Sequence, residues 1–164
     1  MIRLSYMKIV SMLNNIISKP VSKGFSKGRN SSSSQSPNRS VAFRHVDVGS
    51  CNACEIEISS AFGPVYDASR FGMSLVASPR HADGLLVTGV VTQNMYGPLM
   101  KTYEATPKPK IIIACGDCAI NGGIFKDSYG VKGILSDVLE VSYSIPGCPP
   151  HPQQIVETFR NINR

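Results

Sequence analysis

The sequence has no tryptophan, an aromatic content of 7% and only five cysteines among its 164 residues. So few cysteines exclude a small scaffold held together by disulfides. No run of eighteen or more apolar residues is present, so we expect no transmembrane helix. A chain of this length fits one compact domain with its own hydrophobic core.

Acidic residues are absent from residues 1–40, which carry seven of the seventeen lysines and arginines. The remaining ten cations stand against all eleven acids, so residues 41–164 have a net charge of −1. The overall charge of +6 therefore belongs to an N-terminal arm. Because no cationic surface is left for the body, we expect no nucleic-acid partner.

Residues 1–40 and 41–164 are predicted to be separate units. Apolar residues within 2–17 recur at steps of three and four, which predicts a basic amphipathic helix. Residues 20–40 are rich in serine and glycine and predict a flexible linker. Three interpretations of the arm stay open: a disordered terminus, a helix on a partner or an anionic membrane, and an organellar transit peptide.

Strand-like and helix-like segments alternate through residues 41–164, which predicts an α/β domain whose mostly parallel sheet carries helices on both faces. The expected strands are Val41–Val48, Met73–Ala77, Gly84–Gly89, Lys110–Ala114 and Val138–Ile145, and the expected helices are Glu55–Phe62, Asn94–Thr106 and Gln153–Asn163.

Every cysteine follows a predicted strand. Cys51 and Cys54 follow the first, Cys115 and Cys118 follow the Ile111–Ile113 run, and Cys148 follows the last. Because parallel strands end at the same edge of a sheet, where open α/β folds bind ligands, we expect these cysteines to converge.

Four chemistries would use such cysteines. Disulfides need an oxidising compartment, to which nothing in the chain points. A thioredoxin-like pair at Cys51 and Cys54 leaves Cys148 unexplained. Structural zinc would use two C-x-x-C pairs, but their separation far exceeds that of zinc ribbons. An iron–sulfur cluster needs four thiolates, and five cysteines supply four ligands and one bystander.

Four motifs together resemble the small-subunit family shared by membrane-bound [NiFe] hydrogenases and the cluster-bearing B-type subunits of complex I (NADH-quinone oxidoreductase). They are Gly49–Ile58 (GSCNACEIEI), Ser78–Asp83 (SPRHAD), Gly116–Ala119 (GDCA) with Gly122-Gly123, and Pro146–Pro150 (PGCPP). The C-x-x-C spacing is similar to that of the energy-converting hydrogenases and formate hydrogenlyase, whereas complex I proteins generally have adjacent cysteines there. Ala53 stands where this branch usually has glycine.

The resemblance implies a flavodoxin-like three-layer α/β/α fold and one [4Fe-4S] cluster. Its ligands would be Cys51, Cys54, Cys118 and Cys148. Cys115 falls where the family does not require cysteine, and we interpret it as a small buried residue at a strand end.

The resemblance gives a role to Glu57, and the chemistry of a negatively charged cluster gives roles to Arg80 and His81. Glu57 matches an acid near the cluster and the interface with the large subunit, and Glu55 is the weaker candidate in the same helix. Arg80 would donate hydrogen bonds to the cluster, and His81 would titrate with its redox state. The plainer alternatives are a solvated helix acid and an ordinary polar loop.

The function implied is electron transfer beside a catalytic large subunit of a membrane-associated [NiFe] hydrogenase, with no catalysis by this chain alone. The other expected partners are a ferredoxin-like iron–sulfur subunit and membrane-embedded ion-pumping subunits, at the cytoplasmic face of the membrane. Two alternatives are a B-type subunit of complex I that passes electrons to quinone and, more distantly, a zinc-stabilised binding module without redox function.

Overall fold

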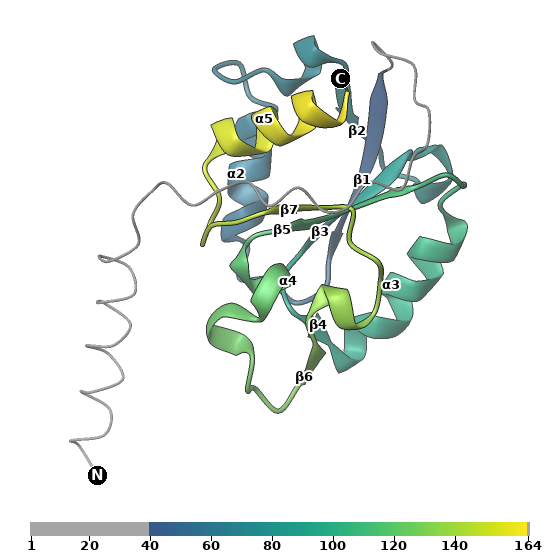
Figure 1. Cartoon of the computed structure of the whole chain (residues 1–164), viewed down its shortest axis with the longest axis vertical. Helices are drawn as coiled ribbons and strands as arrows, with labels where there is room; N and C mark the ends of the chain where they lie inside the picture. Colours follow the sequence, from purple (N-terminus) through teal and green to yellow (C-terminus); the bar gives the residue numbers. More distant parts are fainter. Residues whose placement is uncertain (1–39, 164) are drawn as a thin grey trace, which may run out of the picture.

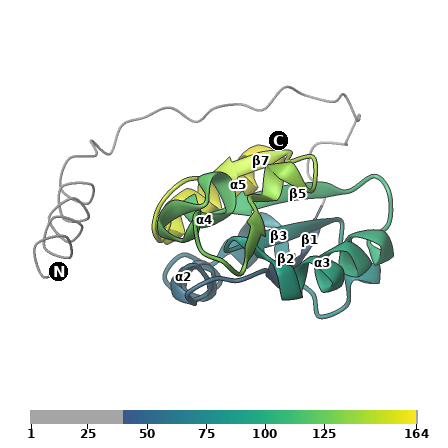
Figure 2. The ribbon, with the colours of Figure 1, turned by 90° about the horizontal axis from the view of Figure 1, so that it is seen from below.

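The structure is a computed structural model that describes residues 40–163. Its main sheet has five parallel strands in the order β2-β1-β3-β5-β7. Figure 2 shows β1, β3, β5 and β7 following one another across the sheet. This is the strand order of flavodoxin-like folds, so the predicted fold class is confirmed. The strands are β1 (Val41–Asp47), β2 (Met73–Leu75), β3 (Gly84–Thr88), β5 (Ile111–Cys115) and β7 (Tyr143–Ile145).

The central strands β3 and β5 are buried at every residue. Their sequences, GLLVT and IIIAC, are continuous apolar runs rather than alternating ones. Such runs are typical of parallel strands that are covered on both faces. The glycines and prolines around these runs made both strands predictable within one residue.

Helices cover both faces of the sheet (Figure 1). On one face lie α2 (Ala53–Ala61) and α5 (Pro152–Ile162), and the Phe159 ring of α5 stacks on Phe43 of β1 at 5.1 Å. On the other face lie α3 (Gln93–Ala105) and the short α4 (Asp117–Asn121), where Leu99 is fully buried. The layers are those of the predicted α/β/α arrangement.

Two local elements differ from the prediction. The strand expected over Val138–Ile145 is only Tyr143–Ile145, and it is preceded by a 3₁₀ turn at Leu135–Asp137. The N–H groups of Val138 and Leu139 both donate to the Leu135 carbonyl, so the start of the expected strand bonds to its own turn instead of to a neighbouring strand. A second, antiparallel pair of β4 (Val91–Thr92) and β6 (Val131–Gly133) was not predicted, because strands this short leave no periodic signal.

Three further 3₁₀ turns, Ala68–Phe71, Pro79–His81 and Gly123–Phe125, complete the elements. None of the helices in residues 40–163 has the length and apolar character needed to span a membrane. The predicted amphipathic arm and serine-rich linker lie outside the described residues, apart from Ser40.

Candidate functional site

The cysteines lie at the edge where the parallel strands end. Cys51 follows β1, and Cys54 is the second residue of α2. Cys118 is the second residue of α4, directly after β5, and Cys148 follows β7. Segments that are distant in the sequence therefore reach the same edge, as the sequence predicts.

The first pair of cysteines is separated by a tight turn. Asn52 has a left-handed conformation with φ of 69°, which asparagine tolerates better than most residues. Asp47 stabilises the approach to this turn, because its Oδ1 accepts hydrogen bonds from the backbone N–H groups of Gly49 and Ser50 at 2.8 Å each. As a result Cys51 is exposed while Cys54 is buried.

The second pair is held by hydrogen bonds between α4 and the loop after β7. The backbone N–H of Asp117 donates to the Gly147 carbonyl at 2.8 Å, and the Gly147 N–H donates to Asp117 Oδ1 at 2.9 Å. These two bonds connect the residue before Cys118 to the residue before Cys148. The positions of the two cysteines are thus linked across 30 residues of chain.

Two glycines leave space beside the sulfur atoms. A Cβ atom on Gly116 would lie 2.6 Å from Cys54 Sγ, and one on Gly123 would lie 3.0 Å from Cys118 Sγ. Gly116 also has a φ of +90°, which side-chain-bearing residues rarely adopt. Glycine is therefore required at position 116 both by the backbone and by the thiol next to it.

The thiols at this edge interact electrostatically. Burial raises the pKa of Cys54 to about 12, and negative charge on Glu55, Cys118, Cys51 and Cys148 contributes to the increase. Burial and the charges of Cys148 and Cys51 likewise raise the pKa of Cys118 to about 11. Thiolates that interact in this way repel one another, so the deprotonated set needs a positively charged group to stabilise it.

Cys115 differs from the other four cysteines. It is the last residue of β5, fully buried within the core that includes Phe43 and Ile155. Burial is the main cause that raises the pKa of its thiol above the ordinary value, so the thiol stays neutral. It packs as a small apolar residue below the edge.

Cysteine thiols are the donors that this edge offers to a metal group. Cluster ligands are four cysteine thiolates, and this edge supplies four besides the buried Cys115. Within residues 40–163, no three His, Cys, Asp or Glu side chains are grouped closely enough to hold a single metal ion. The space that Gly116 and Gly123 leave next to the sulfurs is compatible with a bulky group bound by all four.

Of the two acids considered in α2, Glu55 is the one held by side-chain contacts below the cysteines. The Thr88 hydroxyl donates a hydrogen bond to Glu55 Oε1, and His45 Nε2 lies 3.4 Å from the same oxygen. Glu57 is half-buried further along the helix. The sequence motif points to Glu57 rather than to Glu55. The contacts of Glu55 are with residues far away in the sequence, so no local sequence pattern reveals them.

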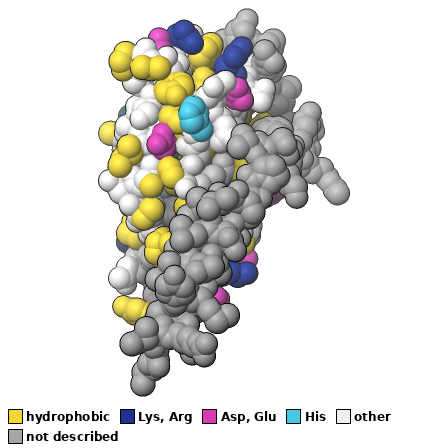
Figure 3. All heavy atoms as spheres, turned by 90° about the vertical axis from the view of Figure 1, so that its left-hand side faces the viewer, with side chains coloured by type: hydrophobic (Ala, Val, Ile, Leu, Met, Phe, Trp, Pro, Cys, Tyr) yellow, Lys and Arg dark blue, Asp and Glu magenta, His cyan; other side chains and the backbone are white. Residues whose placement is uncertain are grey.

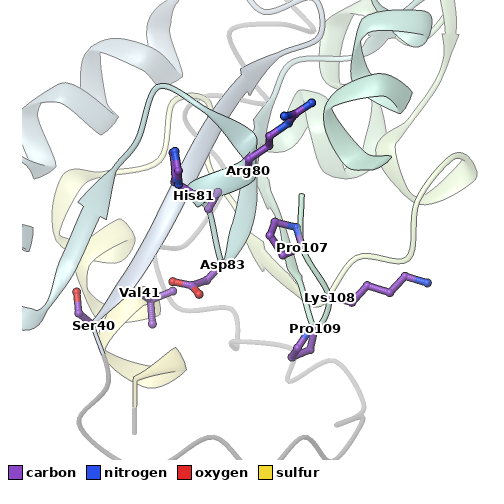
Figure 4. A pocket seen from close by; sticks show the side chains of 9 residues that line it. Ser40, Val41, Arg80, His81, Asp83, Pro107, Lys108 and Pro109 are labelled. Atoms are coloured by element: carbon purple, nitrogen blue, oxygen red, sulfur yellow. The ribbon is translucent and has the colours of Figure 1, made fainter. Parts of the chain in front are cut away.

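Arg80 and His81 lie at the opposite edge, before β3. They line a cavity of about 220 Å³ together with Val41, Asp83 and the 107–109 segment, at the amino ends of β1, β3 and β5 (Figure 4). The side chains of Arg80 and Lys108 extend outward from this cavity. The fold therefore does not bring Arg80 and His81 to the cysteines, although the motif that contains them supports the family resemblance.

Comparisons with known proteins agree with this architecture. The chain is 49% identical over 121 residues to formate hydrogenlyase subunit 7 of Escherichia coli strain K12, covering 74% of this chain and 48% of that protein. It is 50% identical over 112 residues to the probable membrane-bound hydrogenase subunit mbhJ of Pyrococcus furiosus, covering 68% of this chain and 67% of that protein. The chain thus spans about half the length of the first relative and two thirds of the second.

A solved structure is similar as well. A chain of the membrane-bound sulfane sulfur reductase (MBS), an archaeal respiratory membrane complex, has a TM-score of 0.66 and 33% sequence identity, covering 76% of this chain and 69% of that one. Residues 51–162 match the family described as NADH ubiquinone oxidoreductase, 20 Kd subunit. The resemblance predicted from the four motifs is confirmed, and the chain belongs to this family of oxidoreductase subunits.

Proposed function

We propose that this chain binds one [4Fe-4S] cluster through Cys51, Cys54, Cys118 and Cys148 and transfers electrons within a membrane-associated complex. The observation that carries the proposal is the meeting of these four cysteines, from three loops, at one edge of the sheet. Family membership and the space beside Cys54 and Cys118 support it. A cluster bound there would accept and release one electron at a time.

The chain's own residues determine how the cluster would be held. Cys54 and Cys118 are buried, so their sulfurs would bind on the side of the domain core. Their raised pKa values mean that both thiols are protonated before binding and release protons as the iron binds. Cys51 and Cys148 are exposed and would bind on the outer side, so a partner is needed to exclude water there.

The outer side has the features of a protein interface. Ile56 of α2 and Ile124, next to Gly123, are 57% and 63% exposed. Figure 3 views the molecule from the side on which the chain passes from β7 into α5, and hydrophobic side chains are spread over the visible part of this face among few charged ones. We assign this face to the large subunit, which would bring its acceptor site close to the cluster.

The large subunit we propose is of the [NiFe] hydrogenase type. Both relatives are named as subunits of hydrogen-metabolising systems, and the C-x-x-C spacing of Cys51 and Cys54 is that of the hydrogenase branch. Electrons would come from a ferredoxin-like subunit, and membrane-embedded ion-pumping subunits would complete the complex. The assembly would lie at the cytoplasmic face of the membrane.

A pair of cysteine variants tests the cluster. The full chain, purified anaerobically with its partners, is expected to contain iron and acid-labile sulfide and to give an EPR signal on reduction. Cys148→Ser is expected to lose the signal, whereas Cys115→Ser, which changes a thiol outside the set, is expected to keep it. A Cys148→Ser protein with an unchanged signal, or a wild-type protein with stoichiometric zinc and no iron, would overturn the assignment.

A quinone-reducing role within complex I is the second candidate, favoured by the family to which the chain belongs. Activity of the purified complex separates the two functions. Nickel in the large subunit together with hydrogen evolution from a reduced donor supports the hydrogenase, and nickel-free quinone reduction supports the alternative. Either result leaves the role of the four cysteines intact.

A further inference from the structure

Two arginines lie against one aromatic ring at the amino edge of the sheet, the edge opposite the cysteines. The guanidinium carbons of Arg70 and Arg160 lie 4.7 Å and 4.9 Å from the centre of the Phe71 ring. Arg70 and Phe71 end the 3₁₀ turn before β2, and Arg160 belongs to the last turn of α5. Because both distances are measured to one ring, the fold holds two positive charges close together. We call Arg70, Phe71 and Arg160 the two-arginine site.

The fold fixes the position of this site. The side-chain amide of Asn163 donates a hydrogen bond to the Phe71 carbonyl at 3.0 Å, which joins the end of α5 to the 3₁₀ turn. Phe71 is half-buried, while both arginines are exposed. The face of an aromatic ring attracts a guanidinium group and restrains its orientation. Both guanidinium groups are therefore held at the surface, where a ligand can reach them.

The positive charge of this site is not neutralised within residues 40–163. Neither arginine forms a salt bridge with an acid of this part of the chain. Glu157, the acid of α5, accepts a hydrogen bond from Gln153 Nε2 instead. A helix dipole explains one cation in each last turn, but it does not explain why two cations meet on one ring. Since guanidinium donors match the oxygens of a phosphate group, a bound phosphate would relieve the repulsion between the two charges.

The two edges of the sheet carry opposite charge, although residues 41–164 have a net charge of −1. At the amino edge, five lysines and arginines stand against one acid, Asp83, in residues 68–72, 79–83, 106–110 and 159–163. Asp83 Oδ2 accepts a hydrogen bond from the Ala42 N–H. At the carboxyl edge, residues 47–58 and 116–123 carry four acids and no lysine or arginine. The amino edge is thus the side of the domain that suits an anionic surface.

The start of β1 brings further cations to the two-arginine site. The Ser40 hydroxyl and the Val41 N–H donate to the carbonyl of Gly72, the residue after Phe71, at 2.9 Å and 2.8 Å. Figure 1 shows the end of α5 close to β2 on this side of the molecule. Residues 1–40 carry seven cations and no acid, and they join the domain at this point. Cations from two parts of the chain suit an extended array of phosphates better than a single one.

We infer that the two-arginine site binds the phosphate groups of anionic phospholipids, so that this chain contacts the membrane directly through its amino edge. The choice of a membrane as the anionic partner rests on the proposed function. Arg80 and Lys108, whose side chains extend outward at the same edge (Figure 4), would add outer contacts to lipid phosphates. The cysteines, at the other edge, would face away from the lipid.

The test is the binding of lipid vesicles by the full chain, purified anaerobically without its partners. Vesicles of equal parts phosphatidylglycerol and phosphatidylcholine are the anionic probe, and vesicles of phosphatidylcholine alone are the neutral probe. Sedimentation is expected to show binding to the anionic vesicles only. Binding is expected to be lost between about 0.1 M and about 1 M salt, because the screening length falls from about 10 Å to about 3 Å. Equal binding to both kinds of vesicle would overturn the inference.

Paired variants identify the side chains responsible. Arg70→Gln with Arg160→Gln is expected to bind anionic vesicles about 30-fold more weakly, since each basic side chain near such a surface contributes a factor of about five. Lys126→Gln with Lys132→Gln is the matched control and is expected to bind like the wild type. It makes the same change in net charge and also removes a cation from a ring, because Lys132 Nζ lies 3.4 Å from the centre of the Tyr96 ring. Unchanged binding by the arginine pair, or an equal loss in both pairs, overturns the inference.

A lysine pair separates a phosphate site from charge alone. Arg70→Lys with Arg160→Lys keeps both charges but loses the planar fork of donors, so its affinity is expected to lie between those of the wild type and the glutamine pair. Wild-type affinity in the lysine pair would overturn the inference. Urea denaturation of each variant shows whether it folds, and the lysine pair decides the outcome if the glutamine pair does not fold.

Two further outcomes separate this inference from others. Duplex DNA, added at the same phosphate concentration as the anionic vesicles, is expected to leave the protein bound to lipid, and complete displacement by DNA overturns the lipid assignment. A wild-type chain that binds vesicles but gives no iron–sulfur signal with its partners overturns the proposed function alone. A chain with a normal iron–sulfur EPR signal and no binding to anionic vesicles overturns the inference alone.

Discussion

The two edges of the parallel sheet are built from the same strands but have different contents. At the carboxyl edge, loops after β1, β5 and β7 bring together cysteines, tight glycine turns and a buried polar group. At the amino edge, Arg80, His81 and Lys108 surround a small cavity, and the side chains of Arg80 and Lys108 extend outward from it. Side chains that converge on one space, rather than polar character alone, make the carboxyl edge the candidate site.

The largest effect is expected from adding one methyl group at the carboxyl edge. Gly116→Ala places a Cβ 2.6 Å from Cys54 Sγ and forces alanine into a conformation that costs about 1–3 kcal/mol. We expect loss of most of the bound iron, measured per chain after anaerobic purification. Gly130→Ala is the matched control, because a Cβ there has no neighbour within 4 Å. Equal iron contents in the two variants would contradict the space requirement at Gly116.

A smaller loss is expected when the link between α4 and the loop after β7 is removed. Asp117→Ala eliminates the acceptor of the Gly147 N–H, a charged hydrogen bond of the kind that contributes about 1.5–3 kcal/mol. We expect a lower denaturation midpoint and faster loss of the EPR signal in air. Asp137→Ala removes a comparable carboxylate–backbone bond, to Ile134, in a segment that carries none of the four cysteines and is expected to keep the wild-type rate of signal loss.

The burial of His45 beside Thr88 and Glu55 is expected to make the stability of the domain depend on pH. The pKa of His45 is lower in the folded chain than in the unfolded chain, where it is about 6.5. Between these two values the unfolded chain binds more protons, so the free energy of unfolding decreases as pH falls below about 6.5. His45→Gln should remove this part of the decrease, as measured by urea denaturation at pH 5 and pH 8. A pH dependence as steep as that of the wild type would show that other groups cause it.

The smallest effect is expected at the amino edge. Arg80→Gln and His81→Gln change polar groups that do not reach the cysteines, so iron content and the EPR spectrum should match those of the wild type. The measurement is the spectrum of the reduced complex beside that of the Gly116 variant. A changed spectrum in either amino-edge variant would mean that the two edges are coupled through the sheet.

Much of this architecture is predictable from local sequence. Gly84 begins β3 and Gly89 follows its last residue. The β-branched run Ile111–Ile113 forms the central strand β5 as expected. The cysteines after three of the strands are expected to meet, because parallel strands end at the same edge of the sheet. The strand order itself follows from the resemblance and is confirmed by the fold.

Other parts were not predictable, for a physical reason. Asp117 and Gly147 are 30 residues apart, and Thr88 and Glu55 are 33 apart, so their hydrogen bonds depend on the finished fold and not on any local period. Arg80 and His81 belong to a family motif, and a motif does not say at which edge its side chains lie. Their distance from the cysteines follows only from their place before β3.

The order in which the four cysteines appear along the chain has a consequence for biosynthesis. Cys51 and Cys54 leave the ribosome early, but Cys148 follows β7, the last strand of the sheet to be synthesised. A cluster that needs all four ligands can be inserted only after translation has reached that loop and β7 has joined the sheet. Early termination just before residue 148 would leave a chain with its strands but without the fourth of the proposed ligands.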